Sequence, residues 1–155
     1  MNIFKDLISN DILICSVVGY LLAQILKVFT VIYEEKRFDI HRLWGAGGMP
    51  SSHSAAVCAL AFSCARTLGV GSPLFAFSVV IAGVVMYDAT GVRRAAGEQA
   101  KLLNHIVTDL FSGNPEYSQK ALKELIGHTP LQVVAGAVLG ILIGLFFPSL
   151  APLVA

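Results

Sequence analysis

A short window of polar residues, GGMPSSHSAA at residues 47–56, interrupts an otherwise apolar chain. It combines two glycines and a proline with three serines and a histidine. Serine hydroxyls and the amides at a helix start donate hydrogen bonds to anions, and Pro50 suits the approach to such a start. A histidine can transfer a proton or attack phosphorus. The window therefore predicts a bound anion such as phosphate. The structural alternative is that Ser51 or Ser52 only caps the following helix.

Four cations are candidates for holding the oxygens of that anion: Lys27, Arg42, Arg93 and Arg94. Arginine offers a planar, permanently charged fork that matches phosphate geometry. Lys27 lies inside an apolar stretch, and an ionisable residue within a membrane span is a functional candidate by default. The alternatives are that Arg93 and Arg94 only determine membrane topology, and that Lys27 only extends its ammonium to the interface.

Two further polar stretches, YDATGVRR and IGHTPLQ, lie later in the chain. The second contains His128, and together with His53 it supplies the two histidines that we assign to proton transfer or attack on phosphorus. We interpret the remaining histidines, His41 and His105, as structural.

The composition is typical of a membrane protein. Of 155 residues, 55% are hydrophobic and 14% are charged, whereas soluble domains carry about 25% charged residues. The net charge of +1 gives no indication of nucleic-acid binding. The three cysteines lie in apolar runs without metal-ligand spacing, so we predict that they are small buried hydrophobic residues. Four stretches approach the length of about 20 residues needed to cross a bilayer as helices: 11–33, 54–70, 73–92 and 129–150.

Between the third and fourth stretches, the pattern at residues 93–111 predicts an amphipathic helix, and residues 116–127 predict a shorter one. We therefore predict an all-α fold, a polytopic membrane helix bundle with about four transmembrane helices plus one or two amphipathic helices. It forms a single integral-membrane domain over residues 1–155. Following the chain through these spans returns all three polar stretches to one face, where they can form one site. Glycines at 136, 140 and 144 predict a small-residue face for close helix packing.

The distribution of basic residues predicts an orientation. Eight of the eleven lysines and arginines fall in segments on the same side as the polar stretches. The positive-inside rule places that side in the cytoplasm and both termini outside. We therefore expect a multi-pass protein of the cell inner (plasma) membrane, with the face that carries the site in the cytoplasm.

The polar stretches also resemble the motifs of a known superfamily. PSSH at residues 50–53 resembles the P-S-G-H signature of the type-2 phosphatidic acid phosphatases, a superfamily that includes the vanadium haloperoxidases. HTPLQVVAG at residues 128–136 resembles the closing H-x-P-x-D-V-x-x-G segment. GGMPSSHSA, YDATGVRRAAGEQA and GHTPLQVVAG resemble more specifically a divergent branch of that superfamily. The resemblance extends from residue 24 to residue 140.

This resemblance implies a role for each candidate residue. His128 would attack phosphorus and form a phosphohistidine, and His53 would protonate the leaving alkoxide. Fixed donors would hold the phosphoryl oxygens without a metal or other cofactor. The residues assigned to this phosphate-binding role are Lys27, Arg42, Ser51, Ser52, Arg93 and Arg94.

The sequence also departs from the superfamily pattern. Ser52 replaces the signature glycine, and neither the K-x6-R-P motif nor the usual S-R before the closing histidine is present. Gln132 stands where an aspartate would orient His128. A glutamine carbonyl can fix the tautomer of the ring, but it cannot stabilise an imidazolium as a carboxylate does. Asp88 is a second candidate for the orienting role.

Two classes of function fit these residues. The first is a membrane phosphatase that hydrolyses a lipid-linked phosphate or pyrophosphate through a phosphohistidine. The second is a catalytically silent membrane protein that binds or transports a phosphorylated lipid. Retention of both histidines and several arginines favours the enzyme, whereas Gln132 favours the silent protein. We prefer the enzyme. In either class the expected partners are a phosphorylated lipid and the membrane lipid itself. A haloperoxidase is a third possible function, but the small size and membrane character of the chain argue against it.

Overall fold

The computed structural model describes residues 3–35, 48–110 and 127–148, and these ranges contain helices and connecting turns but no strand. The all-α class is therefore confirmed. The shorter helix predicted at residues 116–127 falls, up to residue 126, outside the described residues, and so does Arg42. The helices are α1 (Ile3–Ile8), α2 (Asp11–Glu35), α3 (Ser52–Leu68), α4 (Pro73–Thr90), α5 (Val92–Leu110) and α7 (Pro130–Phe146).

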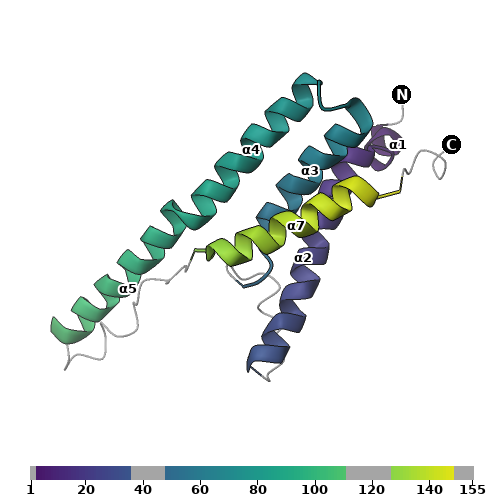
Figure 1. The fold of residues 1–155 in the computed structure, drawn as a ribbon. Coiled ribbons are helices and arrows are strands. Elements are labelled where there is room, and N and C mark those ends of the chain that lie inside the picture. Colours follow the sequence, from purple (N-terminus) through teal and green to yellow (C-terminus); the bar gives the residue numbers. More distant parts are fainter. Residues whose placement is uncertain (1–2, 36–47, 111–126, 149–155) are drawn as a thin grey trace.

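Local sequence signals determine where the central helices begin and end. α3 ends at Gly69, whose φ of +85° lies in the left-handed region that glycine adopts without strain. α4 begins at once, because the Ser72 hydroxyl accepts a hydrogen bond from Phe75 N at 3.2 Å and Pro73 occupies the first helical position. α4 ends at Gly91, and α5 follows directly (Figure 1).

The bundle is organised around α3, which packs against α7, α2 and α4 (Figure 1). The contact with α7 is made by the glycine face that the sequence predicts. A Cβ added at Gly136 or Gly140 would overlap the carbonyl oxygen of Ser51 or Ala55, and one added at Gly144 would approach Phe62 Cβ to 2.7 Å. Because these glycines have no side chain, α7 lies directly on the backbone of α3. We call this contact the α3–α7 seam.

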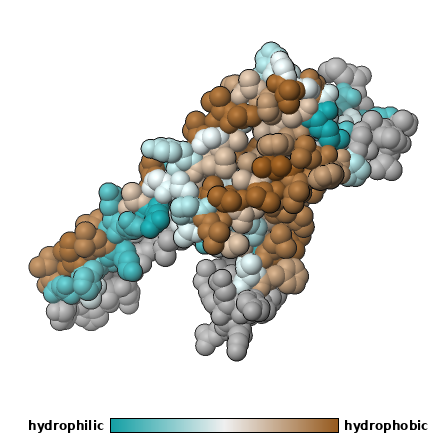
Figure 2. Space-filling view, in the orientation of Figure 1, coloured by the Kyte–Doolittle hydropathy of each residue, from teal (hydrophilic) through white to brown (hydrophobic). Residues whose placement is uncertain are grey.

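The face of the bundle seen in Figure 2 is largely apolar, and many large hydrophobic side chains are exposed. Two segments are long and apolar enough to cross a membrane, Asp11–Thr30 and the continuous α4–α5 run, and α7 is a shorter apolar helix of 17 residues. α3 also has 17 residues, and five of its buried residues are serines or cysteines. Thus the helices that surround α3 carry the most apolar surface, as a membrane bundle requires.

α5 extends α4 away from the rest of the bundle (Figure 1). Its polar residues include Glu98, Lys101 and His105, whereas Leu103 and Val107 are exposed apolar side chains on the predicted apolar face. The amphipathic helix predicted for this part of the chain is therefore confirmed, and we call α4 and α5 together the α4–α5 arm. The short α1 has no counterpart among the predicted elements.

Candidate active site

Lys27 is buried near the end of the first apolar segment. Its side chain is 3% exposed, and its Nζ donates a hydrogen bond to Ser52 Oγ at 3.2 Å. Thr30 Oγ1 lies 2.9 Å from the carbonyl oxygen of Lys27 and 2.8 Å from that of Met49, which links α2 to the segment before α3. Within residues 3–35, 48–110 and 127–148, no carboxylate forms an ion pair with Lys27. A buried ammonium beside a neutral hydroxyl favours the arrival of an anion, because an unpaired buried charge is costly.

The first turn of α3 supplies the hydroxyls of the site. Ser51 is the N-cap of α3, and its Oγ accepts hydrogen bonds from Ser54 N at 3.4 Å and from Ser54 Oγ at 2.9 Å. Ser51 therefore caps α3, as the structural alternative predicted, because its hydroxyl accepts a hydrogen bond from a backbone N–H of the first turn. Ser52, one residue later, directs its hydroxyl to Lys27 instead. Both serines are fully buried.

Gln132 sets the orientation of the His128 ring. Thr129 N and His128 Nδ1 each lie 3.1 Å from Gln132 Oε1. A backbone N–H can only donate, so the amide atom that faces it is the oxygen. The same oxygen faces Nδ1, which must therefore carry a proton, and in the neutral ring Nε2 then carries the lone pair. That is the form of histidine that can attack phosphorus.

Two backbone hydrogen bonds bring the separate polar stretches together. Ser51 N donates to the carbonyl oxygen of Gln132 at 2.9 Å, and His128 N donates to that of Ala89 at 3.1 Å. The first joins the start of α3 to the start of α7, and the second joins the segment before α7 to the last turn of α4. Asp88, half-buried beside Ala89, lies in that last turn. All three polar stretches thus meet at one end of the bundle, with His128 itself buried.

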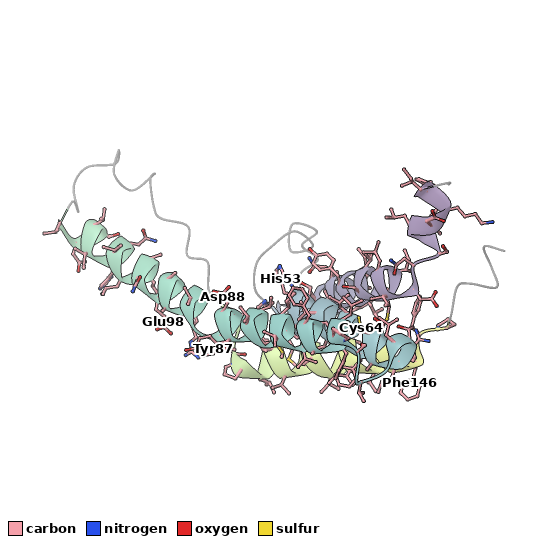
Figure 3. All side chains as sticks on the ribbon, turned by 90° about the horizontal axis from the view of Figure 1, so that it is seen from above. His53, Cys64, Tyr87, Asp88, Glu98 and Phe146 are labelled. Carbon is pink, nitrogen blue, oxygen red and sulfur yellow. The ribbon has the colours of Figure 1, made fainter. Side chains whose placement is uncertain are left out.

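The other predicted site residues lie around this cluster. His53 is exposed on the first turn of α3, and its ring meets that of Tyr20 edge-on with centroids 6.2 Å apart. Figure 3 shows His53 and Asp88 near the same end of the bundle. Arg93 belongs to the first turn of α5. Arg94 Nε forms an ion pair with Glu98 Oε1 at 3.1 Å on the exposed surface of that helix.

Sequence reasoning missed several residues that hold this arrangement. Thr129 is the N-cap of α7 and forms a capping box with Gln132, and the T-P-L-Q pattern carries that signal in the sequence. Thr30 and Tyr20 carry no such signal, because their partners Met49 and His53 are distant in the chain. Their contacts depend on how α2 packs against α3.

The fold and the cluster define a class: a helical membrane protein with a buried cation, a serine-rich helix start and an oriented histidine at one end of the bundle. Comparison with known proteins identifies the family. The model of the Divergent PAP2 family matches residues 8–143, and the chain belongs to that family. It is 41% identical over 150 residues to the uncharacterized membrane protein YuiD of Bacillus subtilis (strain 168), covering 90% of this chain and 95% of the relative. No solved structure matches. The resemblance to the divergent branch is thereby confirmed, and the chain is a membrane protein.

Proposed function

We propose that this protein hydrolyses a lipid-linked phosphate or pyrophosphate through a phosphohistidine formed on His128. The observation that carries the proposal is the network around the start of α3. Lys27 holds its ammonium against Ser52, and Ser51 is bonded to Gln132, the residue that orients His128. The cation and the proposed nucleophile are thus linked through three hydrogen bonds that meet at the adjacent residues Ser51 and Ser52 and at Gln132.

In the proposed reaction, the phosphoryl oxygens lie against Lys27 and the Ser52 hydroxyl. His128 Nε2 attacks phosphorus, so that a nitrogen–phosphorus bond forms while the bond to the leaving oxygen breaks. His53 gives its proton to that oxygen. Water then attacks phosphorus and gives a proton to the deprotonated His53, while the nitrogen–phosphorus bond breaks. This restores both histidines and releases phosphate. Lys27 offsets the negative charge of the phosphoryl group throughout, and Arg42, Arg93 and Arg94 remain candidates for the same role.

Purified protein in detergent, incubated with a panel of lipid phosphates and pyrophosphates, tests hydrolysis directly. We expect phosphate release, together with an acid-labile phosphoprotein trapped by rapid quenching. His128→Ala should abolish both signals. The matched control is His105→Ala, because His105 lies on the exposed surface of α5 near Asp109. Phosphate release that survives in the His128→Ala variant would refute the phosphohistidine.

The role of His53 has a separate test. If His53 protonates the leaving oxygen, His53→Ala should slow substrates with poor alkoxide leaving groups far more than substrates with good phenolate ones. General acid catalysis contributes about a hundredfold or more, and a leaving group that departs as a stable anion does not need it. Equal losses on both substrates would show that His53 only shapes the site.

One observation favours a second candidate, a silent protein that binds or transports a phosphorylated lipid. Gln132 is neutral, and its part in the capping box of α7 already accounts for its presence. Under this reading the cluster binds a lipid phosphate but does not cleave it. Saturable binding of a lipid phosphate without phosphate release, lost in Lys27→Met, would select this candidate over the enzyme.

We also propose that the protein crosses the cell inner (plasma) membrane several times with the site facing the cytoplasm. The basis is the excess of lysine and arginine on the side of the polar stretches. Single cysteines at Ser72 and Thr108, in a background without the native cysteines, test this orientation with a membrane-impermeant thiol reagent. On intact cells we expect labelling at Ser72 and not at Thr108. The opposite pattern would place the site outside.

A further inference from the structure

We infer that an apolar groove between α2 and α7 holds the hydrocarbon chain of the phosphorylated lipid whose head group reaches Lys27. The inference rests on the proposed function and extends it to how the lipid is selected. The groove has a volume of about 420 Å³, within the range of about 300–1,000 Å³ that is usual for ligand pockets. Its walls include Leu26 and Phe29 of α2, Met49 and Pro50 of the connecting segment, and Ala135 and Leu139 of α7.

The groove is lined by residues next to the polar cluster. Thr30 lines the groove, and its Oγ1 contacts the carbonyl oxygens of Lys27 and Met49. Pro50, also a lining residue, is followed directly by Ser51 and Ser52 of the cluster. A molecule with its anionic end at Lys27 and Ser52 therefore has the groove within reach of its other end.

The chemistry of the two parts specifies the occupant. Six of the seven residues that line the groove are apolar, and α2 lies in a segment that is apolar enough to cross a membrane. Lys27, the chain neighbour of the lining residue Leu26, is a buried cation without a carboxylate partner among the described residues. An apolar groove whose lining residues neighbour a buried cation matches a molecule with one hydrocarbon chain and one phosphate. A water-soluble phosphate would leave the groove empty.

The groove gives position and selectivity more than affinity. A lipid chain in the membrane is already surrounded by hydrocarbon, so entering the groove gains packing contacts but little from leaving water. The expected effect is therefore a choice among lipids: a lipid with both a chain and a phosphate is held, whereas the same lipid without the phosphate exchanges with its neighbours.

A second groove provides an internal control. It has a volume of about 330 Å³ and lies between the start of α2, α3 and α4, with Leu13, Cys64, Phe77 and Ile81 among its lining residues. It is apolar too, but it lies at the opposite end of α2 from Lys27. If any apolar groove on this bundle collects lipid, both grooves should behave alike.

Photolabelling in reconstituted vesicles tests the inference. The vesicles contain phosphatidylcholine and a trace of phosphatidate with a diazirine in its chain, and labelled peptides are then mapped. We expect labelling at the α2–α7 groove that unlabelled phosphatidate suppresses and diacylglycerol does not. Ala135→Phe, which fills the groove, should lower this labelling about tenfold, equivalent to about 1.4 kcal/mol. Val138→Phe, on the exposed surface of α7, should leave it unchanged. Leu26→Trp fills the groove from the other wall and covers the case in which Ala135→Phe does not fold.

Each outcome has a defined reading. Equal labelling by diazirine-bearing phosphatidate and diacylglycerol, or equal labelling of the two grooves, would show surrounding membrane lipid only and would overturn the inference. An equal loss of long-chain and short-chain phosphate hydrolysis in Ala135→Phe would do the same, because it would indicate damage to the site. Groove labelling that depends on the phosphate, without any phosphate release, would support the inference and refute hydrolysis. Phosphate release without groove labelling would support hydrolysis and refute the inference about the groove.

Discussion

The α3–α7 seam and the α4–α5 arm are built from similar helices but tolerate change very differently. In the seam, a Cβ added at Gly140 would overlap Ala55 of α3 and come within 2.8 Å of Cys58 Cβ. In the arm, a Cβ added at Gly83 would meet no atom within 4 Å. The close contact at the seam therefore requires glycines without side chains, whereas the arm is exposed along most of its length.

This difference explains where the candidate site is found. The bond from Ser51 to Gln132 crosses the seam at its polar end, and Gly136 lies one turn further along the same contact. Close packing there fixes the distance between the start of α3 and the residue that orients His128. The arm contributes Ala89 as an acceptor for His128 N and then leaves the bundle. The candidate site, whose proposed chemistry needs fixed geometry, thus lies beside the seam.

The same substitution in both regions should give the largest contrast. Gly140→Ala should lower the free energy of unfolding by about 3 kcal/mol, because the new methyl forces the two helices apart. Gly83→Ala should leave it unchanged or raise it by up to about 1 kcal/mol, because alanine favours the helix and the space is open. Unfolding in detergent, followed by circular dichroism, measures both. Equal effects of the two substitutions would refute the distinction between the regions.

Neutralising Lys27 of α2, which contacts the start of α3 beside the seam, and Lys101 of the arm should separate the site from the surface. Lys27→Met should weaken binding of a lipid phosphate by about 10–100-fold, since a hydrogen bond to a charged group contributes about 1.5–3 kcal/mol. Lys101→Met, on the exposed surface of α5, should change binding less than twofold. Titration with a fluorescent lipid phosphate reads both variants. If both substitutions weaken binding equally, the idea of a local site fails, because binding would then depend only on the overall charge of the protein.

Gln132→Glu tests the orienting role of the side chain at the polar end of the seam, because it adds a charge without shortening the side chain. A carboxylate facing Nδ1 stabilises the positive charge that develops on the ring during attack. Turnover should therefore rise by about tenfold, or about 1.4 kcal/mol. Gln132→Met, which has no acceptor, should lower turnover. A fall in phosphate release in a well-folded Gln132→Glu variant would contradict the orienting role assigned to Gln132.

The smallest contrast concerns single polar contacts. Glu98→Ala removes the exposed pair with Arg94 in the arm and should cost no more than about 0.5 kcal/mol. Ser54→Ala removes the buried hydrogen bond to Ser51 at the seam and should cost about 1 kcal/mol. The same unfolding assay detects both. A larger loss for Glu98→Ala would mean that the arm is less independent than its exposure indicates.

Much of the fold was predictable because its signals are local. The apolar stretches gave the helices, and the spacing of Gly136, Gly140 and Gly144 gave the seam. The three cysteines are buried, as their apolar neighbours predicted. Ser51 as an N-cap was one of two alternatives read from the pattern around Pro50.

The contacts of the site were less predictable because they join distant parts of the chain. The sequence nominated Lys27 but not its partner, and Ser52 became that partner only because α2 and α3 pack at a particular rotation. The substitution of the usual aspartate by Gln132 suggested a weakened site. The structure adds that the amide still fixes the ring of His128, since Thr129 N holds its oxygen in place.

The length of the two helices at the seam has a consequence for the surrounding lipid. α3 and α7 each have 17 residues, so each spans about 25 Å at 1.5 Å per residue, whereas the hydrocarbon core of a bilayer is about 30 Å thick. Because α2, α4 and α7 pack around α3, the surrounding lipid meets the shorter length mainly at α7. We expect the bilayer to thin locally beside α7. Such thinning would bring lipid head groups closer to the polar end of the seam, where α7 begins.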